Sequence, residues 1–175
     1  MKPNGTAFAA VALSLLAGST GVAAAQTSGD AAQRIDADCS AIQNATMALK
    51  PIHVAQISGT WRVFAEGDWA AAEETHKSVV FADVWKQGNA PAWVSAHSFN
   101  ANGDQRAVQL CFRQADGTLE RAKQAATAPD LDAAAAETAY FAPDGSVIQK
   151  TALFEVNDPA IAKKVADLPF YSVLP

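Results

Sequence analysis

Apolar and polar residues alternate most regularly in residues 105–113. Val108, Leu110 and Phe112 are apolar at even positions, where Arg106 is the exception. The polar residues Gln105, Gln109 and Arg113 lie at odd positions. A period of two with one polar face is typical of a strand in an antiparallel sheet that buries its other face. Residues 79–85 are apolar on both faces with one exception, which predicts a strand covered on both sides. A further strand is predicted at residues 92–99.

Turn-forming pairs recur at a nearly constant spacing between residues 77 and 156. They are Gly88-Asn89, Asn102-Gly103, Asp116-Gly117, Pro129-Asp130 and Asp144-Gly145. Asn-Gly and Asp-Gly pairs favour hairpins, because both residues tolerate the positive φ of tight turns. Successive pairs lie about 14 residues apart, which leaves room for a strand of roughly eight to ten residues. The pattern therefore predicts an antiparallel meander of about five to seven strands within residues 59–156.

Residues 119–140 allow two interpretations. They are rich in Ala, Glu, Lys, Arg and Gln, which are strong helix formers and favour two short helices. The regular turn spacing and the hairpin pattern of residues 140–148 favour strands instead. We predict strands, because pairing with neighbouring strands commonly overrides local propensity. Residues 147–156 are predicted to close the meander.

Two helices are predicted to flank the meander, which makes the fold class α+β and β-dominated. Residues 30–50 carry apolar residues at steps of three and four, the spacing of one helix face, and Cys39 lies on that face. The second helix is predicted at residues 158–168, where Asp158 or its predecessor caps the first turn and Pro159 follows.

Residues 57–64 predict the strand that opens the meander. The triplet Gly59-Thr60-Trp61 within it resembles the Gly-x-Trp motif on the first strand of lipocalins. This resemblance implies a short N-terminal helical segment followed by an up-and-down barrel that binds small apolar ligands. The Thr-Asp-Tyr signature of that family is absent, since residues 142–145 form the comparable turn. Two arrangements stay open: a calycin-like barrel, or an open curved sheet wrapped on the N-terminal helix.

The first 25 residues have the three parts of a secretory signal peptide. Lys2 supplies the positive charge, residues 7–16 form an apolar run, and Ala23-Ala24-Ala25 fits the cleavage pattern. The apolar run is too short for a membrane span, which needs about 20 residues. We therefore predict a signal peptide at 1–25 and a periplasmic or secreted protein without an integral membrane segment after processing. Residues 26–175 then form a single globular domain.

Composition agrees with one domain and excludes one class of partner. The chain has 175 residues, of which 50% are hydrophobic and 18% charged, so it can bury a core. Its net charge is −5 and it has no run of basic residues. Nucleic-acid binding therefore has no electrostatic support.

Export gives the two cysteines a structural interpretation. Cys39 and Cys111 are the only cysteines, and an oxidising compartment favours a disulfide between them. The alternative, a reactive thiol, requires a nearby base, and no His is close to either residue in sequence. Cys111 lies on the polar face of residues 105–113. A disulfide would therefore place the N-terminal helix over that face.

Motifs for catalysis, metals and cofactors are missing from the sequence. His53, His76 and His97 are more than 20 residues apart and form no metal-binding pair. Glu73, Glu74 and His76 are close in sequence. They form either a weak site for a divalent cation or a solvated loop. No motif for acyl, phosphoryl or hydride transfer is present. We therefore expect a non-enzymatic protein without cofactor or metal, although a triad of distant residues stays open.

The tryptophans are the candidate ligand-binding residues. Trp61, Trp69, Trp85 and Trp93 all lie in one window of 33 residues. They either fill the core or form an aromatic wall for an apolar ligand or a sugar. Trp69 is the best candidate, because its surroundings resemble a loop. We expect an exported domain that binds a small apolar ligand or a cell-envelope component. The alternative is a periplasmic protein-interaction or envelope-structural module without a small-molecule ligand.

Overall fold

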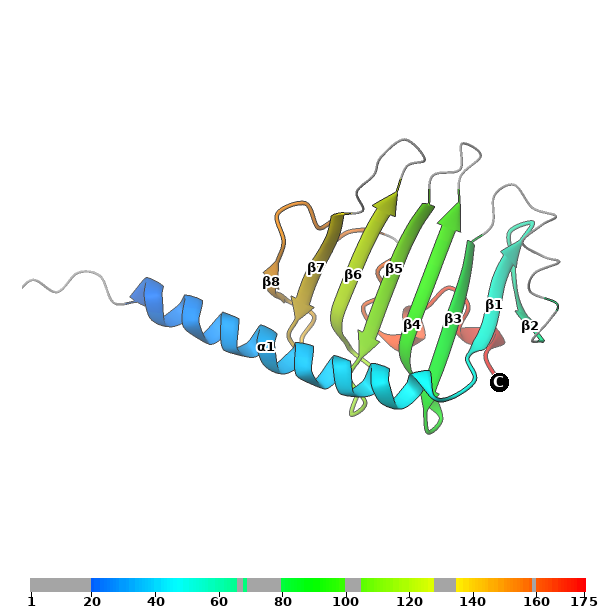
Figure 1. The fold of residues 1–175 in the computed structure, drawn as a ribbon, viewed down its shortest axis with the longest axis horizontal. Helices are drawn as coiled ribbons and strands as arrows, with labels where there is room; N and C mark the ends of the chain where they lie inside the picture. Colours follow the sequence, from blue (N-terminus) through cyan, green and yellow to red (C-terminus); the bar gives the residue numbers. More distant parts are fainter. Residues whose placement is uncertain (1–19, 66–67, 69–79, 100–104, 128–134, 159) are drawn as a thin grey trace, which may run out of the picture.

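The fold is that of a computed structural model, which describes residues 20–65, 68, 80–99, 105–127, 135–158 and 160–175. These residues form one antiparallel sheet, one long helix and an irregular C-terminal segment (Figure 1). Among the described helices, none combines the length and the apolar character that a membrane crossing requires.

Eight strands form a single antiparallel meander, which confirms the predicted meander but exceeds the five to seven strands expected from the turn spacing, since β1 lies before residue 59. Their bounds are β1 (Ile52–Ile57), β2 (Thr60–Phe64), β3 (Val80–Gln87), β4 (Ala90–Phe99), β5 (Gln105–Phe112), β6 (Leu119–Thr127), β7 (Ala135–Phe141) and β8 (Val147–Lys150). The strand order is β2-β1-β3-β4-β5-β6-β7-β8. The strands β2 and β8 therefore lie at opposite edges (Figure 1). The sheet is open, which confirms the open arrangement and shows the barrel to be wrong.

The helix α1 (Thr20–Met47) crosses one end of one sheet face and contacts β3, β4, β5, β6 and β8 (Figure 1). The predicted stripe is largely confirmed, because Ile35, Cys39 and Thr46 are buried against the sheet. The helix begins at Thr20 and not at residue 30. Its first turns extend beyond the β8 edge (Figure 1).

The predicted C-terminal helix at residues 158–168 is wrong. The C-terminal segment instead contains two 3-10 turns, η1 (Val165–Asp167) and η2 (Tyr171–Val173). The backbone amide of Leu119 donates to the carbonyl of Lys163, and the amide of Val165 donates to the carbonyl of Gly117, each over 2.9 Å. These bonds to the β5–β6 turn use backbone groups that an α-helix would bond internally.

The main core lies between the sheet and the C-terminal segment, on the face opposite α1. Phe112 and Phe141 are among its largest fully buried side chains, and Phe154, Ile161 and Phe170 cover them from the C-terminal segment. On β5 the apolar set predicted from alternation, Val108, Leu110 and Phe112, faces this core. Neighbouring residues on β5 point to α1, so both faces of the sheet are packed.

Three of the predicted hairpin turns are confirmed. Gly88, Gly117 and Gly145 have positive φ at the β3–β4, β5–β6 and β7–β8 connections. Asn102-Gly103 and Pro129-Asp130 lie outside the described residues. The strand interpretation of residues 119–140 is confirmed where the structure describes them, by β6 and β7.

Two strand predictions need correction. Residues 57–64 do not form one strand, because Ser58 and Gly59 have φ of 50° and 81° and form the turn between β1 and β2. The glycine of the Gly-x-Trp motif therefore lies in a hairpin turn. Residues 147–156 are strand only to Lys150, after which the chain leaves the sheet and inserts Phe154 into the main core.

Candidate functional site

The tryptophans predicted as ligand-binding residues do not form one wall. Trp85 and Trp93 are register partners on β3 and β4, on the face under α1. Trp61 on β2 faces the other way and packs against Phe170, with the ring centroids 4.9 Å apart. Trp69 lies outside the described residues. The described tryptophans thus contribute to two separate layers of packing.

The predicted disulfide between Cys39 and Cys111 is confirmed and joins α1 to β5. The two Cα atoms are 5.9 Å apart, and both side chains are buried. Trp93 and Ile35 pack around the disulfide. The helix therefore covers the polar face of β5, as the position of Cys111 predicted.

A hydrogen-bonded cluster beside the disulfide also holds α1 on the sheet. Asp36 on α1 accepts hydrogen bonds from Arg121 on β6 over 2.6 Å and from the Tyr140 hydroxyl on β7 over 2.8 Å. The Arg121 guanidinium lies 5.5 Å from the centre of the Trp93 ring, within cation–π range. Asp36 and Tyr140 are 104 residues apart, so no local motif could have predicted the cluster.

The cluster shifts the pKa of both Asp36 and Tyr140. Burial raises the pKa of Asp36, but the hydrogen bonds from Arg121 and Tyr140 outweigh it and hold this pKa below its ordinary value of 3.8. Burial, the hydrogen bond to Asp36 and the negative charge of Asp36 together raise the pKa of Tyr140 to about 12. Asp36 is therefore stabilised as the anion and Tyr140 as the neutral phenol.

We expect the contact between α1 and the sheet to weaken in acid and in alkali. The raised Tyr140 pKa stabilises the fold fully below pH 10, the ordinary tyrosine value, and that contribution is lost as the pH rises towards about 12. The lowered Asp36 pKa stabilises the fold above pH 3.8 and is lost as the pH falls below that value. Urea unfolding at a series of pH values measures both losses.

Tyr140→Phe should remove the part of the stability loss at alkaline pH that comes from ionisation of Tyr140. Tyr171→Phe is the matched control, because it removes a phenol that is exposed. If Tyr140→Phe and the wild type lose stability equally between pH 9 and pH 12, the assignment to Tyr140 is wrong.

Glu120 is a second acidic residue at the junction between α1 and the sheet, and it is only 5% exposed. One of its oxygens, Oε1, lies 2.6 Å from a guanidinium nitrogen of Arg113. Its other oxygen, Oε2, lies 4.0 Å from Sγ of Cys39. Burial raises the pKa of Glu120, against the opposing charge of Arg113.

The described histidines do not combine into a metal site. His53 Nδ1 lies 2.6 Å from Asp83 Oδ1, which links β1 to β3. His97 on β4 stacks on Phe81 with ring centroids 5.0 Å apart. The alternative site at residues 73–76 lies outside the described residues.

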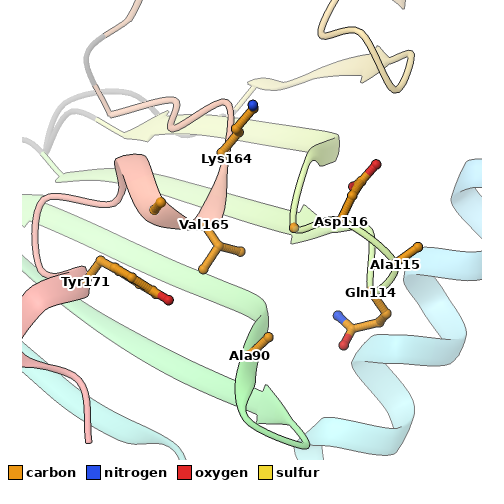
Figure 2. Close-up of a pocket in the computed structure, with 9 residues that line it drawn as sticks. Ala90, Gln114, Ala115, Asp116, Lys164, Val165 and Tyr171 are labelled. Carbon is orange, nitrogen blue, oxygen red and sulfur yellow. The ribbon is translucent and has the colours of Figure 1, made fainter.

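An open pocket of about 420 Å³ lies where the β5–β6 turn meets the C-terminal segment (Figure 2). We call it the Tyr171 pocket. Its lining comes from the start of β4, the β5–β6 turn, η1 and η2: Ala90, Gln114, Ala115, Asp116, Gly117, Lys164, Val165, Ala166 and Tyr171. Tyr171 and Gln114 extend into it from opposite sides, with Val165 and Ala90 between them (Figure 2).

Local hydrogen bonds fix the turn side of the Tyr171 pocket. The Asp116 carboxylate accepts from the amide of Thr118 over 2.9 Å and from its hydroxyl over 2.6 Å. These bonds hold the pKa of Asp116 below its usual range. Gly117 has φ of 68°, and a Cβ there would lie 3.5 Å from Val165. That distance is an ordinary van der Waals contact, so it is the positive φ of the turn that favours glycine here.

The Tyr171 pocket offers groups for binding. Ala90, Val165 and Ala166 give it apolar surface, while Gln114 carries an amide that can both donate and accept hydrogen bonds. Tyr171 is 45% exposed. Sequence reasoning predicted the Asp116-Gly117 turn but not this pocket, because its other side comes from a segment that was expected to be helical.

Comparisons of the chain with protein-family models, with curated proteins and with solved structures found no match.

Proposed function

We propose that the protein is an exported, non-enzymatic domain that binds a short neutral glycan of the cell envelope in the Tyr171 pocket. The observation that carries this proposal is the half-exposed ring of Tyr171 beside a pocket with an amide, a carboxylate and an ammonium group. Ligand sites commonly combine apolar surface with a few such polar groups.

The chemistry of a sugar matches both the apolar surface and the polar groups of the Tyr171 pocket. A pyranose ring has an apolar C–H face that can pack on the flat ring of Tyr171. Its hydroxyls both donate and accept hydrogen bonds, as do the amide of Gln114 and the phenol of Tyr171. Asp116 accepts and Lys164 donates.

The charges at the pocket support a neutral ligand. Asp116 and Lys164 carry opposite charges, and Lys164 is close enough to contribute to the lowered pKa of Asp116. Their side chains extend in similar directions at the upper rim in Figure 2. An anionic or cationic ligand would gain from one of the two groups and be repelled by the other.

A small apolar ligand has less support than a glycan. The expectation of an apolar ligand depended on a barrel interior. The sheet is open, and the face that meets the C-terminal segment is covered by the main core. The proposal therefore moves the binding site from the interior of the meander to its surface. It keeps the cell-envelope component as the ligand class.

We expect neutral oligosaccharide fragments of envelope polymers to bind the purified, oxidised protein with saturation at one site. Tyr171→Ala should weaken binding about tenfold, because it removes the stacking surface. Tyr171→Phe keeps the ring and should bind within a few-fold of wild type. Isothermal titration calorimetry measures both. Leu153→Ala is the control, since Leu153 is 75% exposed and is not part of this pocket.

Two results would contradict the glycan proposal. Saturable binding of long-chain lipids, titrated in parallel, without any glycan response would restore the apolar ligand. No saturable response to either class would favour the protein-interaction module. For that module the outer edge of β2 is the surface to test, because β1 is its one partner among the described strands and Val63 is exposed.

A further inference from the structure

Cys39, Cys111 and Glu120 bring three metal-ligating side chains together in the buried junction between α1 and the sheet. Their ligand atoms all lie within 4.8 Å of one another, and among the described residues this is the one such group. We propose that these residues bind a thiophilic divalent cation, for which Zn²⁺ is the probe, when the disulfide is reduced. The inference is independent of the glycan site.

The distance from Glu120 to Cys39 is near that between two ligand atoms of a tetrahedral zinc ion. Zinc–sulfur bonds of about 2.3 Å and zinc–oxygen bonds of about 2.0–2.2 Å separate neighbouring ligand atoms by about 3.5–3.8 Å. Oε2 of Glu120 lies 4.0 Å from Sγ of Cys39. Reduction lets the two sulfurs move apart to the same spacing. Three protein ligands then leave a fourth position for water.

Arg113 supports Glu120 from the far side. Its guanidinium holds Oε1 over 2.6 Å, while Oε2 stays directed at the sulfur of Cys39. Carboxylate ligands of metals are usually oriented by such an outer hydrogen bond. Two thiolates, one carboxylate, Zn²⁺ and the guanidinium also sum to zero charge. Charge neutrality matters here because all three ligands are buried.

The chemistry has two separate steps. A dithiol reductant gives two electrons and two protons to the sulfur–sulfur bond, so that Cys39 and Cys111 become thiols and the reductant becomes a disulfide. Zn²⁺ then displaces both thiol protons to solvent and forms two zinc–sulfur bonds. The cation thus replaces the covalent connection between α1 and β5 with a coordinate one.

The test uses the full mature protein reduced with a phosphine, which takes an oxygen atom from water and leaves both cysteines as thiols. One equivalent of Zn²⁺ should raise the melting temperature of reduced wild type above that in chelator, and should leave oxidised wild type unchanged. One equivalent of Co²⁺ should give thiolate-to-cobalt absorption and the visible bands of a tetrahedral ion.

Glu120→Gln should weaken Zn²⁺ binding to the reduced protein at least tenfold. Glu155→Gln is the matched control, because Glu155 is exposed and lies in the C-terminal segment. Melting of oxidised Glu120→Gln shows whether it folds; if it does not, the Co²⁺ spectrum of reduced wild type decides. Equal melting temperatures of reduced wild type with Zn²⁺ and with chelator, or a Co²⁺ spectrum without thiolate bands, would overturn the proposal.

Discussion

Replacing both Cys39 and Cys111 with Ala should lower the free energy of unfolding of the oxidised protein by about 4 kcal/mol. The disulfide closes a loop between residues 72 positions apart, and its removal restores conformational entropy to the unfolded chain. For a domain of this size each kcal/mol shifts the melting temperature by about 2–4 °C, so we expect a shift of about 8–16 °C. Differential scanning calorimetry in metal-free buffer measures it.

The control is wild-type protein treated with a phosphine and a chelator, which should melt close to the double variant. Under oxidising conditions the two proteins should differ by the full shift. Thiol titration of unreduced, unfolded wild type should detect no free thiol. Two free thiols in that titration would contradict both the disulfide and the placement of α1 over β5.

Trp93→Ala should destabilise the protein by about 3–5 kcal/mol, the usual cost of removing a large buried aromatic side chain. Trp93 is 3% exposed, packs with the disulfide, and has the guanidinium of Arg121 over its ring. The substitution would leave a cavity beside the disulfide and remove the ring that faces Arg121. Urea unfolding followed by far-ultraviolet circular dichroism measures the loss without relying on tryptophan fluorescence.

Trp61→Ala is the comparison for Trp93→Ala. Trp61 is only partly buried, on edge strand β2, where it packs against Phe170. We expect its loss to cost clearly less, because part of the ring already contacts water. Equal losses from the two variants would contradict the assignment of Trp93 to the core and of Trp61 to its margin. Trp93→Ala should not change glycan binding at Tyr171 if the protein remains folded, because Trp93 lies on the other face of the sheet.

Local patterns were sufficient for several parts of the fold. Alternation on β5 identified its buried face, because the side chains of a strand point to opposite sides in turn. Gly88, Gly117 and Gly145 marked hairpins, because their positive φ is accessible to glycine at little cost. The pairing of Cys39 with Cys111 followed from cysteine count and expected export. That pairing in turn placed the helix over the polar face of β5, because Cys111 lies on that face.

Tertiary structure alone decided whether the sheet closes and how the chain ends. Closure would need pairing between β2 and β8, and no local property of either strand specifies that. Residues 158–168 have the cap and apolar spacing of a helix, yet Lys163 and Val165 form backbone bonds with the β5–β6 turn. The Tyr171 pocket exists only because that segment meets this turn. Its groups come from positions far apart in sequence, and only packing of the C-terminal segment onto the sheet brings them together.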